Sequence, residues 1–290
     1  MSTSTIRSPL EWVFSQVMHV AHGIAFVAGA LYHATQTLNS PAPAVRKISM
    51  ADLRQSLSEG MADSAAYRSD VFFLLLVYPI VSLVIYRFAM HMELLPLLFP
   101  LASGFAILGP FFGIGLYEMS RRREKGLEIT WRNGPDVIER PSFGGMLLLG
   151  LVEGAIFLMW LAAAWAIYQS NMGTEYPTSL AGFINDVLTT DGGHTMIIEG
   201  IGVGFIFALV AMVIGVVSFP MMVDKDCGID TAIATSFRAV MANPGPMAAW
   251  GLIVALGLVV GSIPLFVGLI VVLPALGHST WHLYKKLVPR

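Results

Sequence analysis

Charged residues are scarce in this chain. Asp, Glu, Lys and Arg make up 12% of its 290 residues, whereas hydrophobic residues make up 56%. Soluble globular domains contain about 25% charged residues, so the composition argues against a soluble protein. The formal net charge of −2 supplies no excess of basic residues, and we expect no binding to nucleic acid.

Cysteine is almost missing as well. The single cysteine, Cys227, excludes an intrachain disulfide and a metal cage built from thiolates. No Walker loop, dinucleotide fingerprint or serine–histidine–aspartate arrangement can be recognised. The first residues lack the basic start and the cleavage site of a secretory signal, so we expect an unprocessed chain. The missing motifs predict a protein that is not an enzyme.

Long apolar runs dominate what is present. Six of them are long enough, as helices, to cross a hydrocarbon core of about 30 Å. They cover residues 71–90, 95–117, 145–168, 196–220, 247–263 and 265–284. The sequence therefore predicts an all-α fold, a polytopic transmembrane helical bundle with six spans, which forms a single membrane domain over residues 45–290.

Residues 1–44 form a separate N-terminal part. Their apolar segment, 12–34, is weakened by Ser15, Gln16, His19 and His22. This segment either adds a further membrane helix or lies in the interface. A proline-rich linker, 39–47, follows it.

A short amphipathic helix is predicted over residues 49–66. Ser49 is a suitable N-cap, and Leu53, Leu57 and Met61 recur at the spacing of one helix face. We expect this helix to lie on the membrane surface.

Lysine and arginine predict the orientation in the membrane. All of the 17 basic residues except Arg7 and Arg87 fall on one side of the six-span arrangement, and the loop at 169–194 has none. Cytoplasmic loops carry an excess of basic residues. Both ends of the six-span core are therefore expected to face the cytoplasm.

Two similar segments predict an internal repeat. When Pro110 is set on Pro274, an aromatic residue and a basic pair also coincide, Tyr117 with Trp281 and Arg121–Arg122 with Lys285–Lys286. Residues 52–126 and 230–288 would then be two parallel helical-hairpin repeats, with the spans of residues 145–220 inserted between them.

Four stretches of the sequence resemble one family: GPFFGIGLYEMSRRREKG, SFPMMVDKD, NPGPMAAWG and LPALGHSTWHLYKKLV. Over residues 45–288 the chain is similar to the DUF2189 family of bacterial integral membrane proteins. The resemblance implies a protein of the bacterial inner membrane and no catalytic residues. Some members are labelled putative cytochrome c oxidase subunits, which hints at respiratory membranes.

The chain cannot be the catalytic subunit of such an oxidase. That subunit needs six histidines on several helices to hold two haems and a copper ion. This chain has seven histidines, of which only His278 and His282 lie on a predicted span. A role as an accessory subunit stays open.

His278 and His282 are one helical turn apart and share a face. The sequence HSTWH lacks the glutamate of the HExxH zinc motif. Three interpretations remain: hydrogen bonds to neighbouring helices where a span ends, a metal or cofactor site, and contact with a partner or lipid headgroup. Glu118 is the counterpart of His282 in the repeat, and we hypothesise that the two meet near the cytoplasmic surface.

Glu153 falls near the middle of its predicted span. An ionisable group at that depth must face the protein interior and have a partner, or carry a proton. A buried structural hydrogen bond and a site for proton transfer or substrate are the alternatives.

The cytoplasmic ends of the spans carry residues typical of interfacial anchors. They are Trp281, Tyr284, Arg121, Arg122, Arg123, Lys285 and Lys286. We expect no cofactor and no metal, although haem ligation by His19 or His22 remains a weaker alternative.

Two functions from different classes fit these observations. The first is a non-catalytic accessory or assembly subunit of a larger bacterial membrane complex, with the lipid bilayer and other membrane subunits as partners. The second is a small transporter or permease for an unknown solute or lipid, which would use Glu153.

Overall fold

The computed structural model describes residues 42–67, 83, 92–128, 137–264 and 266–289. The apolar segment 12–34, with His19 and His22, and the first predicted span, 71–90, lie outside the described residues. Within these ranges every regular element is a helix.

The helices follow one another in this order: α2 (Met50–Tyr67), the short 3-10 helix η1 (Met92–Leu97), α4 (Leu98–Phe112), α5 (Ile114–Glu124), α6 (Phe143–Met172), α7 (Leu180–Thr189), α8 (Asp191–Gly215), α9 (Ser218–Lys225), α10 (Ile229–Ala242), α11 (Pro244–Ser262) and α12 (Leu269–Leu287).

Three stretches of the described chain have the length and apolar composition of a membrane span. They are α6, the joined helices α8 and α9 (Asp191–Lys225), and α11. A fourth becomes available if the bent pair Glu93–Gly104 and Ala106–Phe112 counts as one span. These stretches overlap the predicted spans at 95–117, 145–168, 196–220 and 247–263.

The last predicted span, 265–284, does not belong to this set. Helix α12 has 19 residues, but its second half, HSTWHLYKKL, is polar, and the helix is not among the candidate spans. The membrane-protein class is therefore clear from the structure, whereas six spans and the internal repeat stay predictions.

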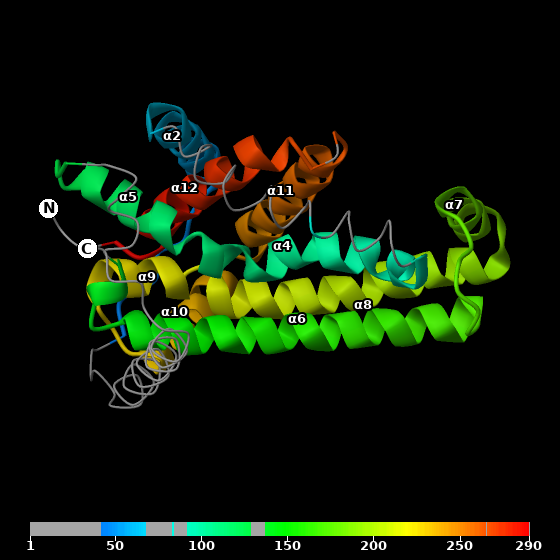
Figure 1. Ribbon diagram of the computed structural model, residues 1–290. Coiled ribbons are helices and arrows are strands. Elements are labelled where there is room, and N and C mark those ends of the chain that lie inside the picture. Colours follow the sequence, from blue (N-terminus) through cyan, green and yellow to red (C-terminus); the bar gives the residue numbers. More distant parts are fainter. Residues whose placement is uncertain (1–41, 68–82, 84–91, 129–136, 265, 290) are drawn as a thin grey trace, which may run out of the picture.

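The long helices lie side by side and define two ends of the molecule. Helices α6 and α8 run along each other, α4 follows them, and α7 crosses one end, here named the α7 end (Figure 1). At the opposite end lie α5, α9 and the C-terminus. We name it the basic end because basic residues gather there, among them Arg121, Arg122, Arg123, Arg140, Lys285 and Lys286.

The main hydrophobic core lies at the basic end. Helix α9 contributes Phe219, Met221 and Met222 to it, all of them buried. The second half of α12 adds Trp281, Tyr284 and other buried side chains. Helix α12 therefore ends inside the protein rather than in lipid, which explains why its second half can be polar.

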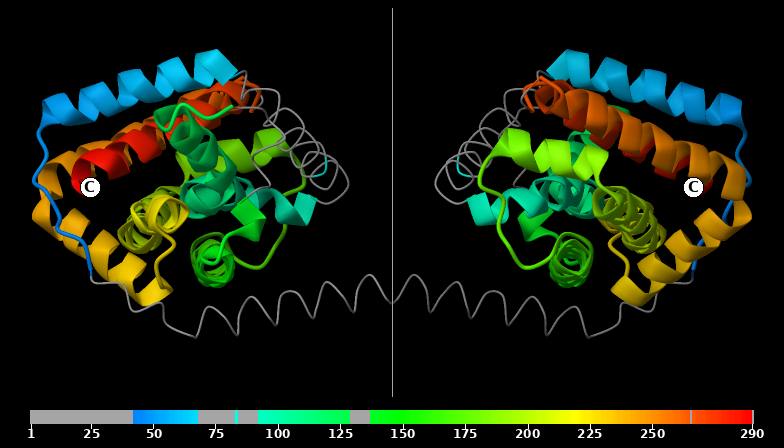
Figure 2. Two further views of the ribbon diagram at one scale, coloured as in Figure 1. Left: turned by 90° about the vertical axis from the view of Figure 1, so that its left-hand side faces the viewer. Right: turned by 90° about the vertical axis from the view of Figure 1, so that its right-hand side faces the viewer.

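Helix α2 packs along α12 (Figure 2). Its start agrees with the sequence, because Asp52 accepts hydrogen bonds from the backbone N–H and the hydroxyl of Ser49. Its buried stripe is Leu53, Ser56, Gly60 and Asp63. Met61, predicted on the apolar face, is 57% exposed, because the face is set by close contact at Gly60 rather than by large apolar side chains.

The linker before α2 is fixed to the C-terminal half of the chain. The Arg46 N–H donates to the Leu287 carbonyl at 2.8 Å, and the Ile48 N–H donates to the Asn243 side chain at 2.7 Å. The Asn243 amide in turn donates to the Arg46 carbonyl at 3.1 Å. One asparagine between α10 and α11 therefore sets where α2 begins.

We predict that Gly60→Ala separates α2 from α12. A Cβ atom at Gly60 would lie 2.3 Å from the backbone nitrogen of Ser279, so one helix has to move. Overpacking of this kind costs about 1–3 kcal/mol, which would appear as a lower midpoint of thermal unfolding in mild detergent. Gly154→Ala is the matched control, because a Cβ there meets nothing within 4 Å. Equal midpoints for the two variants would contradict the packing.

Candidate functional site

The carboxylate of Asp63 is the centre of a buried polar cluster between α2, α5 and α12. Its side chain is 3% exposed and forms an ion pair with Arg123. One oxygen, Oδ2, accepts hydrogen bonds from the Ser120 hydroxyl at 2.7 Å and from Nε2 of His282 at 2.9 Å. We call these residues, together with His278, the Asp63 cluster.

The hydrogen bonds fix the form of His278. Ser120 Oγ lies 2.7 Å from His278 Nδ1, and the single hydroxyl proton of Ser120 already points to Asp63. Ser120 can therefore only accept from the ring, so Nδ1 of His278 carries a hydrogen. The buried ring is part of a chain of hydrogen bonds that ends at the Asp63 carboxylate.

The partners of Asp63 hold it in its charged form. Burial alone would raise the pKa of this carboxyl, but hydrogen bonds from His282 and Ser120 outweigh burial, and the pKa lies below its ordinary value of 3.8. Around the outside of the cluster, Glu59 lies 3.4 Å from His282 Nδ1 and 3.7 Å from the Lys286 ammonium.

Glu118 does not meet His282 as hypothesised. Its carboxylate, 2% exposed, accepts two hydrogen bonds from Arg121, at 2.6 and 2.7 Å. Arg122 binds it at 3.0 Å and Arg140 at 3.3 Å. His282 is instead bound to Asp63 on α2.

Burial would raise the pKa of Glu118, but the hydrogen bond and the charge of Arg121, helped by Arg140, keep it below its ordinary value. Arg140 also reaches Asp226 at 3.2 Å. The basic run after α4 is thus bound internally: Arg121 and Arg122 to Glu118, and Arg123 to Asp63.

The predicted anchors at the end of α12 face the protein interior. The rings of Trp281 and Tyr284 are fully buried. The Tyr284 hydroxyl donates to Asp224 at 2.9 Å, and the Lys285 ammonium binds the same carboxylate at 3.0 Å. Lys285 also lies 5.6 Å from the centre of the Trp281 ring, within the range of a cation–π contact.

Glu153 lies in the interior, as an ionisable residue of a spanning helix should. Its side chain is fully buried. Neither oxygen has a hydrogen-bonding partner in the described part of the chain. A Cβ atom at Gly215 of α8 would come 2.2 Å from Glu153 Oε1, so the carboxyl group points at α8.

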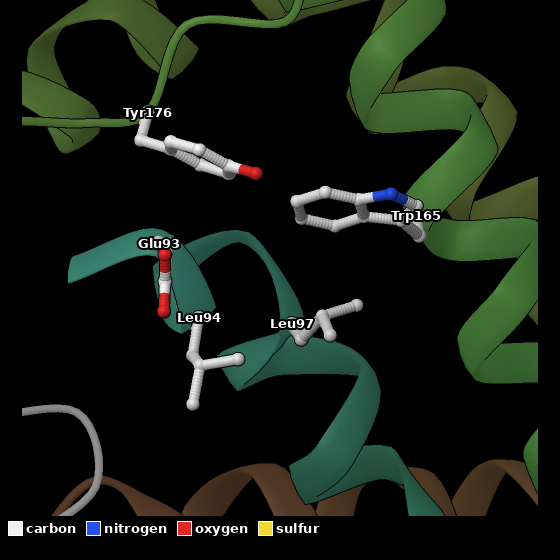
Figure 3. A pocket seen from close by; sticks show the side chains of 5 residues that line it. All are labelled: Glu93, Leu94, Leu97, Trp165 and Tyr176. Carbon is white, nitrogen blue, oxygen red and sulfur yellow. The ribbon is translucent and has the colours of Figure 1, made fainter. Parts of the chain in front are cut away.

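An open pocket of about 360 Å³ lies at the α7 end. Figure 3 shows its five lining side chains, with the rings of Trp165 and Tyr176 above Glu93, Leu94 and Leu97 of η1. The two rings are stacked with centroids 6.2 Å apart. Across residues 42–67, 92–128 and the later described ranges, no three His, Cys, Asp or Glu side chains come together to hold a metal ion.

The amphipathic pattern of α2 did not reveal Asp63. A usable signal was present, since Ser56, Gly60 and Asp63 share the stripe of Leu53. An acidic residue on the buried stripe of a helix needs a partner, but the sequence does not say which one.

Comparison with known proteins identifies the central part of the chain. Residues 98–224 match the DUF2189 family model. The family is described as a predicted integral membrane protein, which confirms the resemblance over those residues. None of the curated proteins and none of the solved structures matches the chain.

The DUF2189 segment runs from α4 to α9. It contains GPFFGIGLYEMSRRREKG and most of SFPMMVDKD, but it ends before NPGPMAAWG and the C-terminal motif. Ser120 and Arg123 belong to the DUF2189 segment, whereas Asp63 and both histidines of the Asp63 cluster lie outside it. The cluster therefore joins the segment to the two flanking parts of the chain.

We predict that Asp63 makes the folded protein sensitive to acid. A carboxyl with a lowered pKa in the folded state binds a proton more weakly there than in the unfolded chain. Ionised Asp63 therefore stabilises the fold fully above pH 3.8, its ordinary pKa. This stabilisation is lost as the pH falls through the lowered pKa of the folded state. At neutral pH, Asp63→Asn removes a buried hydrogen-bonding carboxylate and should cost about 1–3 kcal/mol.

Thermal unfolding in detergent at neutral pH and at progressively lower pH measures both effects. The difference in unfolding midpoint between wild type and Asp63→Asn should shrink as the pH falls. Glu139→Gln, on an exposed residue, controls for the general titration of carboxylates. A gap that stays constant down to the lowest pH would show that Asp63 is not held ionised by the cluster.

Proposed function

We propose that this chain is a non-catalytic accessory or assembly subunit of a larger complex in the bacterial inner membrane. Respiratory complexes are the first candidates, because some members of the resembling family carry an oxidase-subunit label. The proposed orientation places the basic end in the cytoplasm, in line with the excess of lysine and arginine there.

The observation that carries this proposal is a contrast between polar and apolar groups. The buried carboxylates of the basic end, Asp63 and Glu118, and the partly buried Asp224 are bound by basic side chains of the same chain. The spanning helices are largely uncovered, since 33% of the apolar window of α6 and 22% of those of α8 and α11 are buried. Such faces suit lipid and the helices of a partner.

One uncovered face allows close approach of another helix. On α8, a Cβ atom at Gly200 or Gly202 would meet nothing within 4 Å, and Ile198, Ile201 and Phe205 beside them are exposed. Small residues let helix backbones approach each other within a membrane. Helix α8 is therefore the proposed contact with a partner subunit.

We expect the tagged protein, extracted in a mild detergent, to co-purify with a second membrane polypeptide in fixed proportion. Native mass spectrometry reads the composition. An unrelated tagged polytopic protein at matched abundance is the control. Recovery of the protein as a lone monomer or a homo-oligomer would contradict the proposal. A Soret absorption band that co-elutes with the complex would indicate a haem-containing partner.

Gly202→Leu tests the proposed contact. Because the space around Gly202 is open, the variant should fold with an unchanged unfolding midpoint, yet lose most of the co-purifying polypeptide. Gly154→Ala on α6 is the matched open-glycine control. Full retention of the partner by Gly202→Leu would remove α8 as the contact.

A second candidate function is a small transporter for an unknown solute or lipid. The specific observation that favours it is the buried Glu153 carboxyl, which has no hydrogen-bonding partner in the described chain. Uptake measured in vesicles would depend on this carboxyl, so Glu153→Gln should reduce it at unchanged protein level. Unchanged uptake would rule out this role for Glu153.

A further inference from the structure

Glu153 differs from the other buried carboxylates of the described chain. Asp63 and Glu118 are each bound by at least one basic side chain. Glu153 is fully buried on a candidate spanning helix, and no described group donates a hydrogen bond to either oxygen. Its negative charge, if present, would be uncompensated within the bundle.

The side chain lies where two interrupted helices meet α6. Gly215, whose missing side chain leaves room for the carboxyl, is the last residue of α8, and α9 begins at Ser218. A Cβ atom at Gly215 would also lie 3.5 Å from the side chain of Pro110 on α4. Pro110 comes three residues before Gly113, where the chain is interrupted between α4 and α5. Helices α4, α6 and α8 run together there (Figure 1).

The described groups that are known to lie near Glu153 carry no positive charge. Gly215 and Pro110 cannot titrate. The phenol of Tyr117 on α5 is one titratable group close enough to interact with it electrostatically, and a phenol can only be neutral or negative. An ionised carboxylate that is buried without a partner is unfavourable by several kcal/mol or more, so its charge has to be removed by something that binds there.

We propose that Glu153 is a proton-binding site inside the bundle. Binding converts the carboxylate into a neutral carboxylic acid, with the proton on one oxygen. The new O–H group needs an acceptor, and the proposed one is the Ala106 carbonyl, which loses its helical partner because Pro110, four residues later, has no N–H. Proton occupancy and the arrangement of these helices are thereby linked.

This site is independent of any partner subunit. For the transport candidate, on which this part of the inference rests, it names the coupled ion as a proton. Failure to co-purify a partner would contradict the subunit proposal but not the proton site. Absence of a protonated carboxyl at Glu153 would contradict the proton site but not the subunit proposal.

Infrared difference spectroscopy of the full-length protein in lipid tests the site directly. The spectrum of wild type minus Glu153→Gln at neutral pH should contain the carbonyl stretch of a protonated carboxyl, shifted in heavy water. Glu199 is the control, because it is exposed and accepts a hydrogen bond from Asn171 at 2.7 Å. The spectrum of wild type minus Glu199→Gln should lack this protonated-carboxyl band.

Carboxylate bands in the Glu153 difference spectrum would overturn the proposal. If the glutamine variant does not fold, Glu153→Asp replaces it, since a shorter acid displaces the protonated band instead of deleting it. Thermal unfolding is the second readout. Glutamine resembles a protonated glutamate in shape and charge, so Glu153→Gln should unfold at the wild-type midpoint at neutral pH, and a large decrease for a folded variant would count against a bound proton.

Discussion

A buried carboxylate needs partners, and at Asp63 this requirement organises the basic end of the molecule. The oxygens of Asp63 are bound by Ser120 and Arg123 from α5 and by His282 from α12. None of these bonds forms unless α2 lies along α12 at the register set by Gly60 and Ser279. Leaving the carboxylate unpaired would be strongly unfavourable, so one charge fixes the relative position of three helices.

The same residue type serves opposite purposes along the chain. Glu118 is surrounded by Arg121, Arg122 and Arg140. Through Arg140 it connects α5 to the segment before α6. Glu153 lies near glycine, proline and a phenol, and none of these described neighbours offsets a negative charge. Charge pairing thus gives rigidity at the basic end, while the middle of the bundle keeps one group whose ionisation changes the local free energy.

The sequence could predict what depends on single segments. Apolar runs located α6, α8 and α11, the pattern after Ser49 located α2, and depth along a span indicated that Glu153 is buried. It could not predict partners that depend on tertiary register. His282 and Asp63 are 219 residues apart, and their contact follows from how closely α2 approaches α12. The aromatic residues of α12 resemble headgroup anchors in sequence, yet a core built on α9 covers Trp281 and Tyr284.

The distance along the chain between Asp63 and His282 has a consequence in time. At about 5–20 residues per second of synthesis, roughly 10–40 s pass between the appearance of the aspartate and that of the histidine 219 residues later. During this interval α2 lacks α12, the helix against which it packs. Closure of the basic end therefore comes only after α12 has been synthesised, and a chain cut short before α12 would leave Asp63 without its hydrogen bond from His282.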